Sequence, residues 1–379
     1  MSARSIEPSA FVAKATAIAS FYGFKPVRNI ESRLASFGER PGKSARSFDE
    51  VASVCVLCTA REKRGPALCF SVHAIPEEAR YSPREFAEFS LQLIGASSSL
   101  GDVFVIKTAL TILEDMGIKL KEIRINSTGD RESQGRYGKE LSFYIRKRLD
   151  ELTPTCRTAV MDNPFALFSC EEDTCRGVAL EAPRALTFLT EQSREHLREV
   201  LERLDRLGLP YRIDDTLAND VRASRVFFAL DLAEHPLVAA VHGGRYDEYL
   251  RRLTGRKEGV GVRAVILFRK KGLEHKSAEP KPSRAPRIYF IQLGPEAKFK
   301  SLEVMELLRH AHIPVHQSFE SDRISPQLEE ATRLKVPYLI IMGHKEALEN
   351  AVIVRNVANR MQHVVPVGEL SSFLKKQTA

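Results

Sequence analysis

The stretch HGGRYDEYL, residues 242–250, gathers residue types that could bind and position a small molecule. Gly243 and Gly244 lack a Cβ atom, so the backbone there can bend or approach another group closely. Arg245 and Tyr246 follow at once and bring a cation and a phenol to the same place. Such a stretch does chemistry only where the other walls of a binding site are present.

Cysteines and histidines are the other candidates for chemistry. The chain has six cysteines and no secretion signal, which predicts the reduced thiols of a cytosolic protein. Three of them could form a three-thiolate zinc site, but no fourth ligand stands at a recognisable spacing, so we predict no bound metal. The histidines of HAHIPVHQ straddle a helix end and a strand, which favours a metal there even less. The zinc candidates are Cys156, Cys170 and Cys175, the histidines are His310, His312 and His316, and the remaining cysteines are Cys55, Cys58 and Cys69.

Length and composition predict a soluble protein of two or three domains. The chain has 379 residues, 43% hydrophobic and 28% charged, and no apolar run approaches the roughly 20 residues that span a bilayer. A net charge of +8 favours a polyanionic partner, although a well-solvated basic enzyme explains it nearly as well. Residues 1–24 read as an amphipathic helix rather than a signal peptide, with a transit peptide as the alternative. We therefore expect a cytoplasmic protein, with organellar targeting as the second choice.

Hydrophobic periodicity predicts the elements that position these residues. We expect helices over 11–28, ending at Gly23, over 84–118, from Tyr137 onward and over 192–208, and strands over 119–127, 225–232 and 261–268. Residues 270–286 are polar with three prolines and predict a linker. After it strands and helices alternate for roughly 90 residues, which predicts a separate domain with a mixed, largely parallel sheet.

Several stretches, taken in the order in which they occur along the chain, resemble the histidyl-tRNA synthetase family of class II aminoacyl-tRNA synthetases. The resemblance rests on IRINSTGDRESQGRYGKEL, on HGGRYDEYL, and on the C-terminal IYFIQLG, LLRHAHIPV and YLIIMGHKEALENAVIVRNV, and covers about two-thirds of the chain. It implies an α+β fold: a class II synthetase-like antiparallel sheet core with a helical insertion, plus a C-terminal α/β anticodon-binding-like domain. The implied bounds are 1–128 and 212–272 for the core, 129–211 for the insertion, 273–286 for the linker and 287–379 for the last domain.

The family activates histidine with ATP, which needs a cationic clamp because negative charge crowds at the α-phosphorus. The resemblance assigns part of that clamp to an arginine of motif 2. A gapless alignment puts Val72 in its place and Ala74 in the place of a nearby glutamate, and a second alignment deletes the motif outright. In the strand that follows, Ala87 and Glu88 replace a His-Gln pair and Gln92 replaces a glutamate.

The other family motifs depart in the same way. ANDVRASRVFFAL, residues 218–230, stands where the family has a histidine-specific RGLDYYT-like segment. GVGVRAVILFRKKG, residues 259–272, stands for motif 3 and keeps one arginine as a counterpart. Ile30 replaces a motif 1 proline, and only Arg222 or Arg225 could stand in for the lost arginine of the histidine-specific segment. In motif 3, Val265 or Ile266 replaces a glycine, Phe268 replaces a glutamate, and Arg269 is the surviving arginine.

Framework stretches persist while the polar positions of activation are lost, so we predict a catalytically inactive paralogue without a catalytic residue. The remnant of the ligand pocket would be Gly243, Gly244, Arg245, Tyr246 and Arg269, with Arg245 and Tyr246 lining it. We expect no cofactor. ATP and histidine would be ligands only under the alternative of a divergent but active histidine–tRNA ligase.

We expect the basic insertion and the anticodon-binding-like domain to bind tRNA or another structured RNA, or to serve as a regulatory subunit. A protein-interaction subunit without an RNA role is the further alternative. A homodimer is expected through the apolar face of residues 11–28, and no membrane contact is expected. The candidate phosphate contacts, chosen by position and charge, are Arg131, Arg136 and Lys139 in the insertion and Arg309, His316, Arg323 and Lys335 in the last domain.

Overall fold

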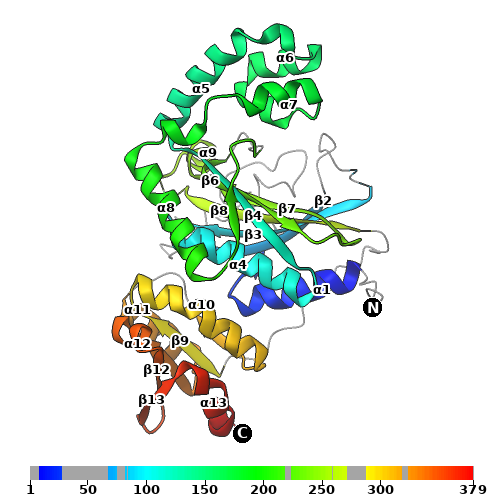
Figure 1. The fold of residues 1–379 in the computed structure, drawn as a ribbon. Helices are drawn as coiled ribbons and strands as arrows, with labels where there is room; N and C mark the ends of the chain where they lie inside the picture. Colours follow the sequence, from blue (N-terminus) through cyan, green and yellow to red (C-terminus); the bar gives the residue numbers. More distant parts are fainter. Residues whose placement is uncertain are drawn as a thin grey trace.

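The computed structural model shows three bodies in a row (Figure 1): a helical lobe, a central sheet and a C-terminal domain. The described residues are 8–27, 67–74, 82, 84–217, 223–257, 259–270, 287–317 and 323–378. The linker predicted over 273–286, Ile30 and Arg222 lie outside them. No helix of this described part is long and apolar enough to cross a membrane.

The central sheet has eight strands within the described residues, in the order β1-β2-β3-β8-β7-β6-β4-β5. Its middle six strands are antiparallel to their neighbours, and a short parallel strand borders each edge. This is the antiparallel core that we predicted. The bounds are β1 Lys25–Pro26, β2 Ala67–Ala74, β3 Phe86–Ile94, β4 Leu120–Gly129, β5 Tyr211–Ile213, β6 Ser224–Leu232, β7 Val238–Arg245 and β8 Gly261–Arg269.

Helices α1 (Pro8–Phe21), α4 (Ser99–Asp115) and α8 (Glu191–Arg206) cover one face of this sheet and share its main core. Their predicted positions are confirmed, except that residues 84–118 contain strand β3 before α4. The sequence of β3, FAEFSLQLI, alternates polar Glu88, Ser90 and Gln92 with apolar residues, so the two-residue period of a strand was present there and was missed.

The helical lobe follows β4 and has a hydrophobic core of its own. That core runs from Tyr137 to Ala185, whereas the buried side chains of α8 belong to the core of the sheet. The separate lobe is therefore shorter than the predicted insertion 129–211. It consists of α5 Arg131–Arg146, η1 Leu149–Glu151, α6 Pro154–Asp162, η2 Pro164–Ser169, α7 Asp173–Leu180 and η3 Ala185–Phe188, and α9 Asp247–Thr254 follows β7 in the central body.

The C-terminal domain has a five-stranded sheet in its described part, ordered β10-β9-β11-β12-β13. The pairings of β9 with β10 and β11 are parallel and those of β12 with β11 and β13 are antiparallel, so the sheet is mixed as predicted but not largely parallel. Helix α11 packs on one face, and α10 and α12 on the other. The bounds are β9 Ile288–Gln292, α10 Pro295–His310, β10 Val315–Gln317, α11 Ile324–Arg333, β11 Tyr338–Met342, α12 His344–Leu348, β12 Ala351–Asn356, β13 Gln362–Pro366, η4 Val367–Glu369 and α13 Leu370–Thr378.

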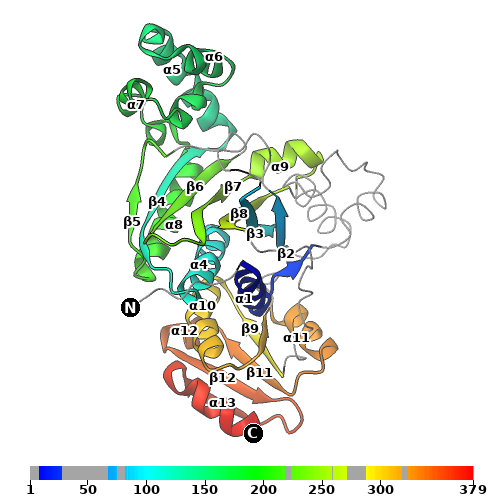
Figure 2. The same cartoon turned by 90° about the vertical axis from the view of Figure 1, so that its right-hand side faces the viewer.

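The apolar face of α1, which we expected at a dimer interface, is used within the chain. Phe11 is fully buried between Phe89 and Phe268, and Ile18 and Tyr22 are also buried. Figure 2 shows α1 where the sheet and the C-terminal domain meet. A homodimer would need another surface, because these side chains already have partners.

Candidate functional site

The face of the sheet opposite α1 and α4 carries the candidate site. Paired residues of neighbouring strands point to the same face, and one row of pairs crosses six strands. Most of its members are small or polar, unlike the apolar rows on the core face. The row is Cys69 on β2, Gln92 on β3, Arg263 on β8, Gly244 on β7, Phe227 on β6 and Asn126 on β4.

The two glycines of HGGRYDEYL are required by sheet packing. A Cβ atom on Gly243 would lie 2.1 Å from the carbonyl oxygen of Arg263 and 2.5 Å from Phe228 Cζ. On Gly244 it would lie 2.9 Å from Phe227 Cβ. These distances are below any real Cβ contact, so the glycines let β6 and β8 close on β7. The paired glycines are explained without a ligand.

Arg245 occupies a different place from the expected one, because its side chain is fully buried rather than lining an open pocket. It points to the helix side of the sheet, where Nη2 donates to Asp102 Oδ2 at 2.8 Å and Nη1 donates to the Ala96 carbonyl at 2.9 Å. Nη1 also lies 3.3 Å from Asp247 Oδ1. Burial alone would raise the pKa of Asp102, but Arg245 and His196 hold that pKa well below its ordinary range. Arg245 is therefore a structural cation that joins β7 to α4.

The other members of the expected pocket remnant are not brought together. Tyr246 is 3% exposed and packs in a small apolar cluster with Cys69, Phe227 and Leu250. Arg269 lies at the far end of β8, seven residues beyond the partner of Arg245, which is roughly 23 Å along a strand. There it is half exposed, stacks on the Phe86 ring at 4.9 Å and lies 3.5 Å from a carboxylate oxygen of Glu85.

Arg263 is the cation that does lie on the candidate face, and the sequence interpretation missed it. Its Nη2 donates to Glu88 Oε2 at 2.6 Å and its Nε donates to Ser90 Oγ at 2.8 Å, and the residue is 5% exposed. A charged residue inside the apolar run GVRAVILF was the available signal, because a buried arginine almost always has a specific partner. Glu88, noted only as a replacement, is that partner.

The two further arginines near this face are paired as well. Arg225 lies in the β-bulge between Ser224 and Phe227 with φ of 57°, and its Nε lies 3.6 Å from Asp247 Oδ2. Arg124 lies 3.0 Å from Asp231 Oδ1 and 3.3 Å from a carboxylate oxygen of Asp214. Arg263, Arg225 and Arg124 are therefore each paired with a carboxylate of the same chain.

Gln92 is a polar group of this face with a hydrogen-bonding atom that no described residue uses. The residue is fully buried, its amide nitrogen lies 3.4 Å from Ser90 Oγ, and its Oε1 has no hydrogen-bond partner among the described residues. A buried acceptor without a donor costs about 1–3 kcal/mol, so the position suits a small molecule or water that donates a hydrogen bond. Nearby, Val72 is 40% exposed and Ala87 faces the apolar core, so neither supplies polar chemistry.

A cleft of about 1040 Å³ lies along the β6–β7 hairpin and β4 rather than at Arg245. Lys121, Arg124, Asp231, His235 and His242 provide its polar lining. Burial lowers the pKa of His235, which therefore favours the neutral form. The cleft can accept a polar ligand, and of its two permanent cations, Lys121 and Arg124, Arg124 is already paired with carboxylates.

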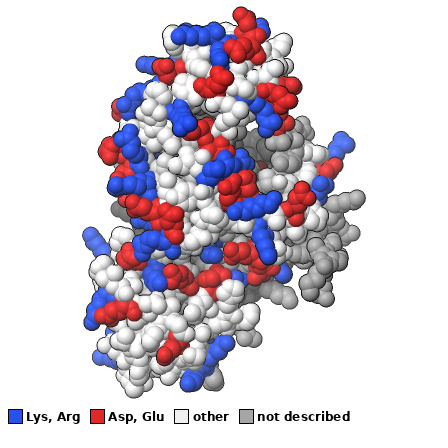
Figure 3. Space-filling view, in the orientation of Figure 1, with Lys and Arg blue, Asp and Glu red and all other residues white. Residues whose placement is uncertain are grey.

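The candidate RNA contacts of the lobe lie on one exposed helix. Arg131, Arg136 and Lys139 are exposed on α5, and Arg136 lies 3.6 Å from Glu132. Figure 3 shows blue and red side chains intermingled over α8 and the lobe on this face, without a continuous basic patch. Ion pairs between Arg194 and Glu191 on α8 account for part of that mixture.

In the C-terminal domain the four candidates separate into two groups. Arg309 is 13% exposed and binds Glu306 and Asp115, so it fixes this domain to α4 instead of facing solvent. Glu306 also accepts a hydrogen bond from Tyr22 of α1. Burial would raise the pKa of Glu306, but bonds from Arg309 and Tyr22 lower that pKa to about 2.

The other three candidates lie along α11. Arg323 and Lys335 are exposed at its two ends, 12 residues or roughly 18 Å apart along a helix. His316 on β10 is 27% exposed and contacts the Tyr289 ring, and burial lowers its pKa. Tyr289 is fully buried, so His316, Arg323 and Lys335 are the members of this group that solvent reaches, and cations of this kind suit the phosphates of a nucleic acid.

The three cysteines considered for zinc meet in the lobe. The Sγ atoms of Cys156, Cys170 and Cys175 lie within 4.8 Å of one another, although the sequence offered no fourth ligand. Burial and the neighbouring thiols raise the pKa of Cys156 to about 12. Burial would also raise the pKa of Cys175, but bonds from the Thr153 amide and hydroxyl lower it below its ordinary value.

Comparisons with known proteins agree with this architecture. Residues 288–377 match a family model described as an anticodon binding domain. The histidine–tRNA ligase of Geobacillus kaustophilus is 29% identical over 307 residues, which are 80% of this chain and 72% of the relative. That of Caldanaerobacter subterraneus is 24% identical over 94% of this chain and 93% of the relative. The solved apo histidyl-tRNA synthetase of S. aureus covers 98% of this chain and 97% of its own, at 20% identity and a TM-score of 0.49.

An antiparallel sheet core joined to an anticodon-binding domain, with relatives of this kind along nearly the whole chain, is the architecture of the class II aminoacyl-tRNA synthetases. Within that class, the chain belongs to the histidyl-tRNA synthetase family.

Proposed function

We propose that this family member no longer activates histidine and acts by binding tRNA. The observation that carries the first half is the pairing of the candidate face: Arg263, Arg225 and Arg124 each lie against a carboxylate of the same chain. ATP brings several negative charges, so a site that binds it needs cations that are not already neutralised. The second half is supported by the anticodon-binding module and the net charge of +8.

The loss of the cationic clamp on ATP determines how much the rate of histidine activation should fall. One preorganised donor to a developing negative charge contributes about 2.7–4 kcal/mol, so losing two removes roughly 4–6 orders of magnitude in rate. Val72 and Ala74, which stand where the family's motif 2 has an arginine and a glutamate, cannot replace such donors. The proposed protein would then retain the synthetase framework without its first reaction.

An active ligase is the second candidate. It is favoured by the relatives, which are histidine–tRNA ligases, and by their match over up to 94% of this chain. It would require other cations to complete the site, because Arg263, Arg225 and Arg124 are already paired. A protein-interaction subunit without an RNA role is the third candidate, and the matched anticodon-binding domain counts against it.

The RNA contacts that we propose are the exposed cations: Arg131, Arg136 and Lys139 on α5, and Arg323 and Lys335 at the ends of α11. Arg309 is withdrawn from this set because it pairs with Glu306 and Asp115. Deleting residues 287–379 would be a poor test, because it would expose the core that α10 shares with α4. Charge reversal at the surface leaves that core intact.

The experiment measures tRNA binding by fluorescence anisotropy at several salt concentrations. The double variant Arg323→Glu, Lys335→Glu is compared with Lys345→Glu, which changes an exposed lysine on α12, across the same sheet from α11. Each phosphate contact contributes roughly 0.7–0.9 to the slope of log K against log salt, so the double variant should lose about 1.4–1.8 of slope. The control should keep the slope of the unmodified protein.

Two results would contradict RNA binding through α11. One is equal affinity of the double variant and Lys345→Glu. The other is displacement of tRNA by heparin at equal phosphate and sulfate charge, because a module that reads unpaired bases must prefer RNA to an arbitrary polyanion.

A further inference from the structure

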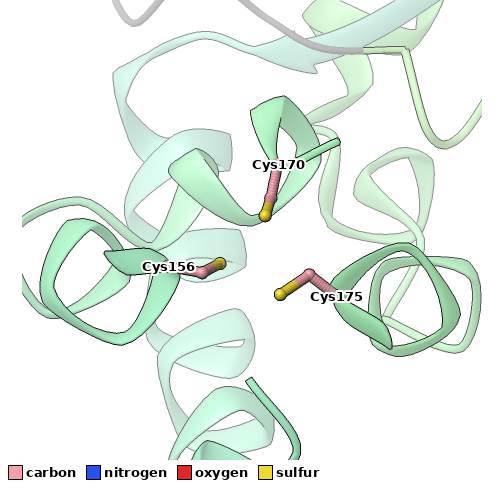
Figure 4. A group of neighbouring side chains, drawn as sticks. All are labelled: Cys156, Cys170 and Cys175. Atoms are coloured by element: carbon pink, nitrogen blue, oxygen red, sulfur yellow. The ribbon is translucent and has the colours of Figure 1, made fainter. Parts of the chain in front are cut away.

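The three-cysteine cluster of the lobe has the form of a metal site (Figure 4). Its thiols come from three separate segments: Cys156 from α6, Cys170 from the residue after η2, and Cys175 from α7. Cys156 and Cys175 are 4% and 0% exposed, and Cys170 is half-buried, which leaves a path from solvent. In the figure all three side chains point toward one common centre.

The sulfur spacing suits one ion. Zinc lies about 2.3 Å from each thiolate, which places tetrahedral ligands about 3.8 Å apart. The three sulfur atoms lie within 4.8 Å of one another, so they need to move only slightly closer together to bind the ion. A disulfide, with its S–S bond of about 2.05 Å, would join two of the cysteines and leave the third without a partner.

Local structure around the cluster favours thiolates. Cys156 is the third residue of α6 and Cys175 the third residue of α7, so both lie in the first turn of a helix, at the positive end of its dipole. The backbone N–H of Thr153 donates to Cys175 Sγ at 3.5 Å. Such donors orient metal ligands and stabilise their charge.

Thr153 marks the fourth side of the cluster. Its hydroxyl lies 3.7 Å from Cys175 Sγ and accepts from the Cys156 backbone N–H at 3.4 Å. Structural zinc sites usually have four protein ligands, whereas three protein ligands and a water are the set found in catalytic zinc sites, and that second set is the one this cluster can supply.

The lobe also has a use for such an ion. Its second half consists of η2 and two helices of nine and eight residues, which are too short to be stable without tertiary contacts. The cluster ties those three segments together. A small core is commonly reinforced by a structural metal.

We propose that Cys156, Cys170 and Cys175 bind one Zn²⁺ as thiolates, with a water beside the Thr153 hydroxyl as the fourth ligand. The three thiols release their protons to solvent as the three Zn–S bonds form, and no electron is transferred. The ion holds α6, η2 and α7 in one arrangement.

The first test is metal content of the full chain, purified without a histidine tag and dialysed, by plasma mass spectrometry. One zinc per chain is expected, and replacement by Co²⁺ should give thiolate charge-transfer and tetrahedral d–d absorption. Cys175→Ser should lose the metal, whereas Cys69→Ser, a buried thiol outside the lobe, should retain it. Zinc well below one per chain, stoichiometric iron, or a disulfide between two of the three cysteines would overturn the proposal.

A gain-of-ligand variant keeps the test decisive if Cys175→Ser fails to fold. Thr153→Cys would complete a four-thiolate set and should raise zinc affinity at least tenfold against a competing chelator. Thr155→Cys adds the same group two residues away on the exposed side of α6 and should leave affinity unchanged. Equal affinities of these two variants would contradict the assigned position of the ion.

Discussion

Removing the Arg245 side chain should destabilise the protein strongly, although the residue lies in the motif that first suggested a ligand. Arg245→Ala would leave Asp102 and Asp247 as buried carboxylates, both about 1% exposed, and would leave the Ala96 and Ser98 carbonyls without their donor. Breaking a buried ion pair from one side costs about 3–5 kcal/mol, because the remaining charge stays out of water. Asp102 would keep only His196, at 3.1 Å.

The measurement is the urea midpoint of unfolding at pH 7, followed by far-ultraviolet circular dichroism. Arg251→Ala is the matched control, because Arg251 makes a single pair with Glu248 at 2.9 Å near the surface. Partly exposed pairs contribute about 0–1 kcal/mol, so the control should unfold close to the unmodified protein. A free energy of unfolding for Arg245→Ala within 1 kcal/mol of the control would refute the structural role.

Two further predictions concern packing and docking. Gly243→Ala should lower the free energy of unfolding by about 1–3 kcal/mol or more in the same assay, because the added Cβ would meet a backbone oxygen. Gly135→Ala on α5, where the added Cβ would have nothing within 4 Å, should raise that free energy by up to about 1 kcal/mol. Equal effects of the two variants would refute the close-approach argument. The Glu306 carboxylate, with an ordinary pKa of 4.5 lowered to about 2, stabilises the folded chain above pH 4.5, and this contribution of about 3 kcal/mol is lost as the pH falls from 4.5 toward 2. Acid unfolding of Glu306→Gln, monitored by calorimetry, should lack that part of the pH dependence, and an unchanged acid profile would contradict it.

Periodicity predicted the elements whose two faces differ. Strand β4 follows from its alternation of apolar and polar residues and helix α8 from its apolar stripe, while β6 and β8 follow from runs rich in β-forming residues. Strand β3 was missed although Glu88, Ser90 and Gln92 alternate with apolar residues in its sequence. The order of family motifs supplied the domain layout, which no local pattern contains.

The candidate site was less predictable because its interactions join residues far apart in sequence. Arg245 meets Asp102 across 143 residues, and Arg263 meets Glu88 across 175. Charge and position alone placed Arg309 among RNA contacts, although its partner Asp115 lies 194 residues away. Cysteine spacing predicted no bound metal for the same reason: Thr153 becomes a neighbour of Cys175 only through the fold.

The central claim is that this family member has lost the activation of histidine. Histidine-dependent ATP–pyrophosphate exchange tests it most directly, with the full chain at micromolar concentration and the Geobacillus kaustophilus histidine–tRNA ligase as positive control. The account predicts no exchange above the background without histidine. Exchange at a thousandth of the control rate or more would contradict it, and the paired arginines of the candidate face would then have to open when ATP binds.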